Sequence, residues 1–435
     1  MSSGAKAKET EVSEAGGASR VVKFGGSSVT GVDRIDTIAA VTRDRLGRCR
    51  PVLVVSAFAK VTATLERMAL AAARGDETTV ELDRLFALHR QAVRDMAEAD
   101  PEVLGRVDRL LADCARLISE IAAARACSPP DLDHVLSFGE RLSSQIVTAA
   151  LVRRGIPAEC VDAAHVVVTD ANHGNARADF GATRRRVVSR VAGRPGVPVV
   201  TGFLGATEAG VRTTLGREGS DYTGAVLASC LTAEGLEIWT DVDGIMTADP
   251  RIVPDAHPLR HLSYDELFDL TSWGAKVVHP KTVEPLREQR IPLTIRNTGA
   301  PSDAGTTIGP SDAGGRSGPL GVTCVDLAAL RAPGHGTPST AETRRRLEGL
   351  LGALDAHDTD ASIVTVVGRR ASPLELDARA VAEALAEHEI GAIAVAEPVP
   401  GRIVSVAVRR RDADAALRAA HRAAFARIPS GPLHA

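Results

Sequence analysis

The strongest constraint on the fold lies in residues 21–56, where two short apolar segments enclose a glycine pair and a helical pattern. The first segment carries Lys23 and ends at the glycines, 25–26; a helical pattern covers 32–46, and the second segment is 52–56. Uninterrupted apolar strands are typical of parallel sheets, whose strands are buried on both faces. Strand, turn, helix and strand form a βαβ unit. The sequence therefore predicts an α/β fold with a mainly parallel sheet.

The length of the chain predicts more than one domain. Its 435 residues exceed the ~250–300 at which a single core stops growing. Strand and helix patterns predict a layered α/β domain at 20–305, with a helical insertion at about 64–130 that we expect to cover the sheet. We expect a disordered leader at 1–19 and a Gly/Ser/Asp/Pro-rich linker at 306–318. The region 319–435 follows the order of small α+β modules, the first of them shortened.

Composition excludes several classes of protein. The formal net charge of -3 gives no reason to expect nucleic acid as a partner. No apolar segment reaches the ~18 residues of a membrane span, and the N-terminus lacks the apolar core of a signal peptide. The six cysteines are scattered without a Cys-x-x-Cys pair, which predicts free thiols and no metal site. Together these features predict a cytoplasmic protein.

The most informative loop for chemistry covers 210–223, where three glycines separate charged and hydroxyl side chains before a helical pattern. Glycines allow close approach of the backbone to a ligand, and a helix N-terminus offers unpaired N–H groups to anions. Arg217 has a planar fork suited to a carboxylate, and Asp221 can hold an ammonium group. The loop is suited to a small zwitterion beside a phosphate. A flexible surface turn with solvated charges remains the alternative.

Lys23 lies just before the glycine pair, where it could stabilise a transferring phosphoryl group. The backbone N–H groups of Gly25, Gly26 and Ser27 could surround the same group. A solvated strand end is the alternative. The chain has no Gly-x-x-x-x-Gly-Lys-Ser/Thr loop and no Gly-x-Gly-x-x-Gly turn, which argues against P-loop and dinucleotide-binding proteins.

Three further segments carry charges beside predicted turns or helix starts. Glu140 is predicted at a helix start, where it either favours the helix dipole or holds a substrate ammonium. The segment 239–251 has turn-forming aspartates and could form a nucleotide pocket with Arg251 facing phosphates. Lys276 could add a cation at a helix start, whereas we interpret His279 as a structural helix-terminal histidine.

Taken together, these segments resemble aspartate kinase of the amino-acid-kinase superfamily, in the order typical of that family. The resemblance covers about 20–305 and rests on six segments: 23–29, 55–57, 137–143, 214–223, 239–251 and 273–280. It implies a three-layer amino-acid-kinase fold with a mainly parallel sheet, followed by C-terminal ACT-like modules. It also implies ATP-dependent phosphorylation of the side-chain carboxylate of L-aspartate, the first step in making amino acids such as lysine and threonine.

The resemblance implies a role for each matching residue. Lys23 and Asp221 would be catalytic. Ser56 and Thr62 would orient the attacking side-chain carboxylate, and Ser220 would lie towards ATP. Glu140 and Asp221 would bind the substrate ammonium group, and Arg217 would bind its α-carboxylate. The nucleotide side would comprise Lys23, Gly25, Gly26, Ser27, Thr240, Asp241, Met246, Arg251 and Lys276. Mg2+ would bridge the ATP phosphates with few direct protein ligands.

Some residues depart from the family pattern. Lys60, Ala63 and Met246 stand where glycine, asparagine and tyrosine are common. The earlier ACT-like module is shortened, and the segment 398–401, with two prolines, stands in place of the strand that usually helps to bind an effector. We therefore expect weak or lost feedback inhibition, and a homodimer through the C-terminal sheet edges. The alternatives are a kinase for a related acidic amino acid and a non-catalytic regulatory subunit.

Overall fold

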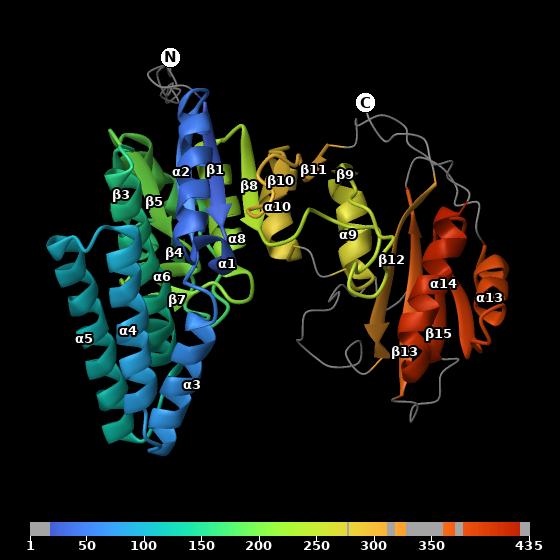
Figure 1. Cartoon of the computed structure of the whole chain (residues 1–435), viewed down its shortest axis with the longest axis horizontal. Coiled ribbons are helices and arrows are strands. Elements are labelled where there is room, and N and C mark those ends of the chain that lie inside the picture. The colour runs from blue at the N-terminus through green and yellow to red at the C-terminus, as the bar shows by residue number, and fades with distance from the viewer. Residues whose placement is uncertain (1–17, 276–277, 311–317, 328–359, 370–376, 427–435) are drawn as a thin grey trace, which may run out of the picture.

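The computed structural model of the chain describes residues 18–275, 278–310, 318–327, 360–369 and 377–426. All but the last two residues of the predicted leader lie outside this part. The described residues form a large α/β body and a smaller α+β body joined by a narrower connection (Figure 1).

An eight-stranded sheet forms the centre of the larger body, in the order β3-β5-β2-β1-β8-β10-β11-β9. All neighbouring pairs are parallel except β10 with β11. The strands are β1 (Ser19–Phe24), β2 (Arg50–Val55), β3 (Ala158–Val161), β5 (Val197–Thr201), β8 (Gly235–Thr240), β9 (His261–Ser263), β10 (Leu293–Asn297) and β11 (Thr306–Gly309). The predicted mainly parallel sheet is confirmed. β11 lies within the segment predicted as a linker.

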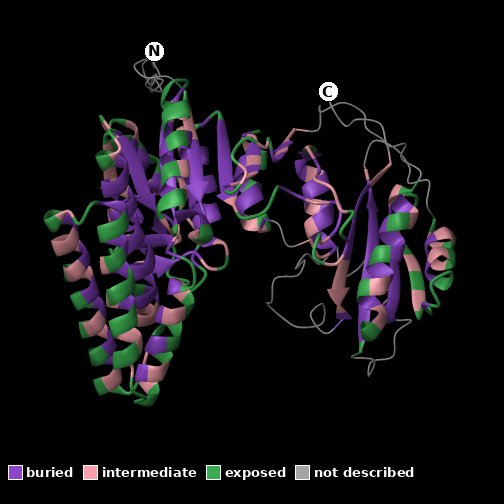
Figure 2. Cartoon of the chain, viewed as in Figure 1, coloured by how far each residue is buried: buried purple, intermediate pink, exposed green. Residues whose placement is uncertain are grey.

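Helices cover both faces of this sheet, which makes three layers (Figure 2). One face packs against α2 (Val32–Leu46) and α6 (Pro129–Arg153), and the other against α8 (Gly219–Leu231) and α10 (Pro280–Glu288). Successive side chains of a strand point to opposite faces. Val22 and Phe24 accordingly join the core with α2, whereas Val21 joins the core with α8. The same alternation directs Lys23 towards α8.

Three helices fill the region predicted as an insertion: α3 (Val61–Arg74), α4 (Thr79–Met96) and α5 (Pro101–Ala124). They pack on one another and on α6, and they project past the sheet (Figure 1). The expectation that the insertion covers the sheet is wrong. Apolar side chains such as Leu111 and Ile118 are buried between these helices and α6, in the same core that includes Val22 and Phe24 of β1.

Several short elements escaped the sequence patterns. The remaining elements of the larger body are α1 (Gly26–Val29), η1 (Ala163–His165), β4 (Val168–Thr169), α7 (Phe180–Val187), η2 (Val188–Ala192), β6 (Leu204–Thr207), β7 (Arg212–Thr214) and α9 (Tyr264–Ser272). β4, β6 and β7 form a small separate sheet. Strands of two to four residues are too short for a periodic pattern to reveal.

The smaller body contains a four-stranded antiparallel sheet in the order β12-β13-β15-β14. Its elements are β12 (Pro319–Asp326), β13 (Ala361–Gly368), α13 (Ala378–Ala386), β14 (Ala394–Val399), β15 (Ile403–Arg409), η3 (Arg410–Asp412) and α14 (Ala413–Phe425). The predicted ACT-like α+β order is confirmed. Most of the shortened module falls in 328–359, outside the described residues.

The two bodies share buried contacts rather than a bare tether. Thr247, in the loop after β8, receives the backbone N–H of Val322 on its carbonyl at 2.7 Å. Arg402, before β15, lies 3.4 Å from Asp269 in α9, and Arg369 lies 3.2 Å from Glu266. These contacts show that the smaller body packs on the segment that follows β8 and on α9.

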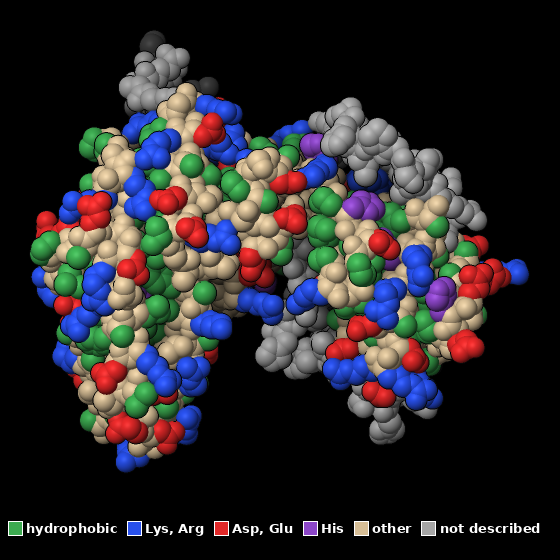
Figure 3. Space-filling view, in the orientation of Figure 1, with side chains coloured by type: hydrophobic (Ala, Val, Ile, Leu, Met, Phe, Trp, Pro, Cys, Tyr) green, Lys and Arg blue, Asp and Glu red, His purple; other side chains and the backbone are tan. Residues whose placement is uncertain are grey.

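Positive and negative side chains are interspersed over the face of the molecule shown in Figure 3.

Candidate active site

Lys23 lies in β1 one residue before the strand ends, and its side chain meets the first turn of α8. Its Nζ is 2.5 Å from Oδ1 of Asp221, and both side chains are nearly buried. The contact is an ion pair rather than an aligned hydrogen bond, because Asp221 Oδ1 has no hydrogen-bond donor in good geometry among the described residues. Two residues predicted as catalytic from distant segments are thus brought together.

The start of α8 is tightly packed against the chain segment after β5. Ser220 is buried, and a Cβ added at Gly202 would lie 2.5 Å from the Ser220 Oγ. Only a glycine at 202 allows this approach. The predicted loop at 210–223 is therefore partly regular, since its first half contains β7 and its second half opens α8 at Gly219.

Glu140 lies in the middle of α6, so the prediction of a helix start at this residue is wrong. The helix begins after Ser128, which forms a capping box with Asp131. The interpretation through the helix dipole therefore fails. Glu140 is 3% exposed, and its Oε2 has no hydrogen-bond partner among the described residues. Burial raises the pKa of Glu140 to about 8, although the Ala57 N–H and the charge of Lys23 oppose this rise.

The glycine turn after β1 is only partly available to a ligand. The Gly25 N–H donates to the carbonyl of Trp239 at 2.9 Å, so Gly25 cannot give the same N–H to a phosphate. This corrects the prediction that all three N–H groups of the turn face a ligand. A Cβ at Gly26 would lie 2.8 Å from the Ala57 carbonyl oxygen, and Ser27 is exposed in α1. Of the three backbone N–H groups predicted to bind a phosphate, only those of Gly26 and Ser27 therefore remain candidates.

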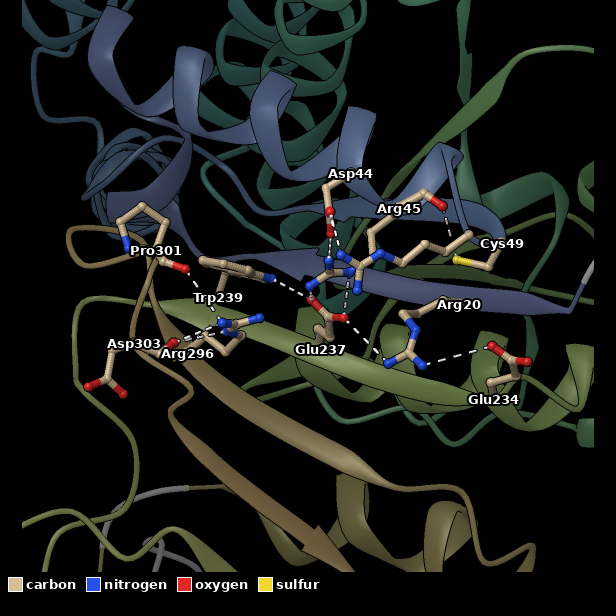
Figure 4. Close-up of polar contacts among 11 residues, drawn as sticks. Arg20, Asp44, Arg45, Cys49, Glu234, Glu237, Trp239, Arg296, Pro301 and Asp303 are labelled. Atoms are coloured by element: carbon tan, nitrogen blue, oxygen red, sulfur yellow. Dashed lines mark hydrogen bonds and ion pairs between the residues drawn. The ribbon is translucent and has the colours of Figure 1, made fainter. Parts of the chain in front are cut away.

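A buried ion-pair network supports this turn from the α2 side of the sheet (Figure 4). Arg45 of α2 donates to both carboxylate oxygens of Glu237 in β8, at 2.8 and 2.9 Å. The Trp239 indole N–H donates to the same carboxylate at 3.0 Å. The guanidinium of Arg296 lies 4.9 Å from the Trp239 ring centroid. Because Trp239 accepts the Gly25 N–H, the network holds the strand that anchors the glycine turn.

The remaining substrate-side residues, Ser56, Thr62 and Arg217, differ in burial and in their contacts. Ser56 directly follows β2, and its carbonyl accepts the Ser143 hydroxyl at 2.7 Å, which ties it to α6 near Glu140. Thr62 lies half-buried in the first turn of α3. The Arg217 side chain is 65% exposed, and its Nε is 4.0 Å from Glu218. An exposed guanidinium of this kind is accessible to a carboxylate ligand.

The nucleotide-side residues divide into two groups. Thr240 is the last residue of β8 and Asp241 directly follows it. Trp239 of the same strand pairs with Phe24 of β1, so both residues lie next to the glycine turn. Met246 forms an isolated bridge with Pro258 farther along the same loop. The Arg251 side chain is 85% exposed and pairs with Asp249 at 2.6 Å, and within the described part of the chain no contact links it to the Lys23 ion pair. Lys276 lies outside the described residues.

Two charged residues in this region had no predicted role. Glu218 lies between Gly216 and Gly219 in the predicted loop, and its backbone has a positive φ of 54°. Lys281 lies in the first turn of α10, after His279. The His279 ring caps this helix by accepting the N–H of Lys281, as predicted. The sequence showed that Glu218 lies among glycines, but it gave no sign of the residue that its carboxylate contacts. Across the described residues, no three His, Cys, Asp or Glu side chains group as a metal site.

Comparison with known proteins decides the family. The family model described as Amino acid kinase family matches residues 19–297. The chain belongs to the amino acid kinase family. The chain is 37% identical over 301 residues to an aspartokinase of Schizosaccharomyces pombe, and the match covers 66% of the chain and 58% of the relative. It is 34% identical over 308 residues to the chloroplastic aspartokinase 1 of Arabidopsis thaliana, covering 69% and 53%.

Solved structures support the same fold. E. coli aspartokinase III in complex with lysine and aspartate has a TM-score of 0.73 at 25% identity, and the match covers 93% of this chain and 99% of that chain. The predicted resemblance to aspartate kinases is confirmed. The chain spans about half the length of the curated relatives it matches. None of the helices in the described part is both long and apolar enough for a membrane span.

Proposed function

We propose that the chain transfers the γ-phosphoryl group of ATP to the side-chain carboxylate of L-aspartate. The product is 4-phospho-L-aspartate, which begins the synthesis of aspartate-family amino acids such as lysine and threonine. One observation carries the proposal: the Lys23–Asp221 ion pair lies near the buried carboxyl group of Glu140, in a chain of the amino acid kinase family. The names of the curated relatives support aspartate as the acceptor.

On the substrate side, the charges suit a zwitterion with a second carboxylate. Arg217 binds the α-carboxylate through its exposed guanidinium, and Glu140 and Asp221 hold the ammonium group. Ser56 and Thr62 orient the side-chain carboxylate. One of its oxygens attacks the γ-phosphorus, the bond between that phosphorus and the β–γ bridging oxygen breaks, and ADP leaves. A carboxylate is already ionised at neutral pH, so the reaction needs no general base.

On the nucleotide side, Lys23 neutralises the charge that develops on the transferring phosphoryl group. Gly26 and Ser27 offer backbone N–H groups, and Ser220 lies between substrate and ATP. The nucleotide is further held by Thr240, Asp241, Met246, Arg251 and Lys276. Arg251 must leave Asp249 or reach past it to contact ATP, because the two are paired. Mg2+ travels with the ATP phosphates and supplies positive charge there.

The domain organisation and assembly belong to the same proposal. Residues 20–305 form the kinase domain, 306–318 the connection and 319–435 an ACT-like regulatory region. The chain forms a cytoplasmic homodimer through the C-terminal region, whose sheet has the edge strands β12 and β14. Light scattering after size exclusion tests this, with a monomeric mass at micromolar concentration as the contradicting result.

A coupled assay of ADP release tests the function, with aspartate, glutamate and aspartate analogues as acceptors. Hydroxylamine trapping of the acyl phosphate provides an independent readout of the product. We expect aspartate to give the highest kcat/KM and Lys23→Met to give no turnover. A faster reaction with another acidic amino acid would identify the related-kinase alternative. Absence of turnover with every acceptor would favour the non-catalytic regulatory subunit.

A further inference from the structure

We infer that the first turn of α10 holds the backbone on both sides of Arg217, with Glu218 and Lys281 as positioning residues. Glu218 contacts the start of α10 through its carboxylate, and Lys281 contacts the residue before Gly216 through its ammonium group. The inference rests on the proposed function only for the identity of the ligand that Arg217 binds.

Glu218 makes the contact on the C-terminal side of Arg217. Its Oε2 accepts the backbone N–H of His279 at 2.6 Å, a short charge-assisted hydrogen bond. Its backbone has φ 54° and ψ 28°, the left-handed conformation that residues other than glycine rarely adopt. Such a conformation persists where surrounding contacts enforce it. The bond to His279 is one contact that does so.

Lys281 makes the contact on the N-terminal side. Its Nζ donates to the carbonyl of Leu215 at 3.0 Å, to the carbonyl of Ala176 at 2.7 Å and to Asn175 Oδ1 at 3.2 Å. These three acceptors match the three protons of an ammonium group. The Nζ also lies 4.6 Å from the centroid of the Tyr222 ring in α8. Lys281 is therefore held from several sides and cannot easily move away from Leu215.

Leu215 and Glu218 flank the two residues between them, Gly216 and Arg217. Gly216 has φ 81°, and a Cβ there would lie 2.8 Å from Asn175 Oδ1, so the segment that binds Lys281 also packs under this glycine. The backbone of Arg217 is thus fixed at both ends while its side chain stays 65% exposed. A binding group that is ordered before the ligand arrives loses less entropy on binding. Loss of either contact should therefore weaken the binding of the ligand of Arg217 more than it slows the phosphoryl transfer.

Steady-state kinetics of four variants test the inference: Lys281→Met, Glu218→Ala, Glu218→Gln and Arg287→Met. Lys281→Met and Glu218→Ala should raise the KM for aspartate about tenfold, with kcat and the KM for ATP within about twofold. Glu218→Gln keeps a hydrogen-bond acceptor for His279 and should stay near wild type. Arg287 lies in the same helix, paired with Asp265 at 2.7 Å, and its substitution serves as the matched control.

Hydrogen exchange of the loop without substrate separates this inference from the proposed function. Backbone amides of 211–218 should exchange faster in Lys281→Met and Glu218→Ala than in wild type and Arg287→Met. Unchanged exchange together with an unchanged KM for aspartate would overturn the inference. So would a Glu218→Gln variant as impaired as Glu218→Ala, because the contact to His279 would then be irrelevant. If wild type does not use aspartate, the exchange rates still decide whether α10 orders the loop.

Discussion

The side chains of Thr247 and His421 form a buried hydrogen bond of 2.9 Å, although 174 positions separate them in the chain. Thr247 belongs to the loop after β8, directly beside Met246, and His421 belongs to α14 of the smaller body. Burial and the nearby His257 lower the pKa of His421, which favours the neutral form of its ring. The smaller body thus contacts the loop that carries the predicted nucleotide residues.

Thr247→Val should lower the free energy of unfolding by about 1–3 kcal/mol, because it leaves buried polar groups without a partner. The Thr247 hydroxyl also accepts the His257 backbone N–H at 3.1 Å, and valine has no oxygen to replace it. Urea denaturation measures the change. Thr79→Val, at an exposed position of α4, is the control and should cost far less. Equal costs for the two variants would contradict a stabilising junction.

Lys23→Met and Asp221→Asn should each reduce stability by about 3–5 kcal/mol, because each leaves one buried charge unpaired. The double variant should recover most of this loss, since neither charge remains. Turnover should behave differently: Lys23→Met should lower kcat by at least about 100- to 1000-fold, and the double variant should not recover it. A double variant that is as unstable as the sum of the single variants would show that the two side chains act independently.

Glu140→Gln should remove a dependence of aspartate binding on pH. The carboxyl group must lose its proton to hold the ammonium group, and its pKa is raised to about 8. In wild type the KM for aspartate should therefore fall as pH rises towards 8, by up to about tenfold per unit. A KM for aspartate that changes equally with pH in Glu140→Gln would contradict this role.

The same shift in Glu140 predicts the sign of a stability effect. The folded pKa of about 8 exceeds the ordinary value of 4.5, so the folded state binds more protons between these limits. The contribution of Glu140 to stability is therefore complete below pH 4.5 and is lost as pH rises through about 8. The difference in unfolding free energy between Glu140→Gln and wild type should grow in favour of the variant from pH 5 to pH 8, as measured by urea denaturation.

Lys60→Gly should stabilise the fold by about 0.5–1 kcal/mol. Lys60 has φ 69° at the start of α3, a left-handed conformation that costs other residues more than glycine. The greater freedom of glycine in the unfolded chain offsets part of the gain. Arg67→Gly, at an exposed position inside α3, should instead cost about 1 kcal/mol. Melting temperatures of the two variants that shift in the same direction would contradict the argument.

Lysine and threonine should inhibit weakly or not at all at millimolar concentration. Pro398 lies in β14 and Pro400 directly follows it, and neither has a backbone N–H to donate to an amino-acid carboxylate. The pairing of β14 with β15 is also irregular between Ala396 and Val399. Titration calorimetry and inhibition assays measure the effect, with glycine as the control for non-specific binding. Saturable inhibition by either amino acid would sink this prediction.

Much of the fold follows from local patterns in the sequence. The apolar segments at β1 and β2, the glycine turn and α2 appear where predicted, because strand and helix periodicities are properties of neighbouring residues. The helix predicted after the glycine-rich loop is also present, although it begins at Gly219, inside the predicted loop. Short strands such as β6 and β7 were not predictable, since three or four residues carry too little pattern and depend on pairing with distant segments.

Some features of the candidate site were likewise predictable from the sequence, and others were not. Sequence alone identified the residue types that suit phosphoryl transfer, including Lys23, Arg217 and Asp221, and their order along the chain pointed to the family. Only the tertiary structure decided that Lys23 meets Asp221, that the Gly25 N–H donates to the Trp239 carbonyl, and that Glu140 lies buried inside a helix. Chemical types and periodicities are local properties. Partners, burial and shifted pKa values depend on which distant segments pack together, and no local pattern encodes that.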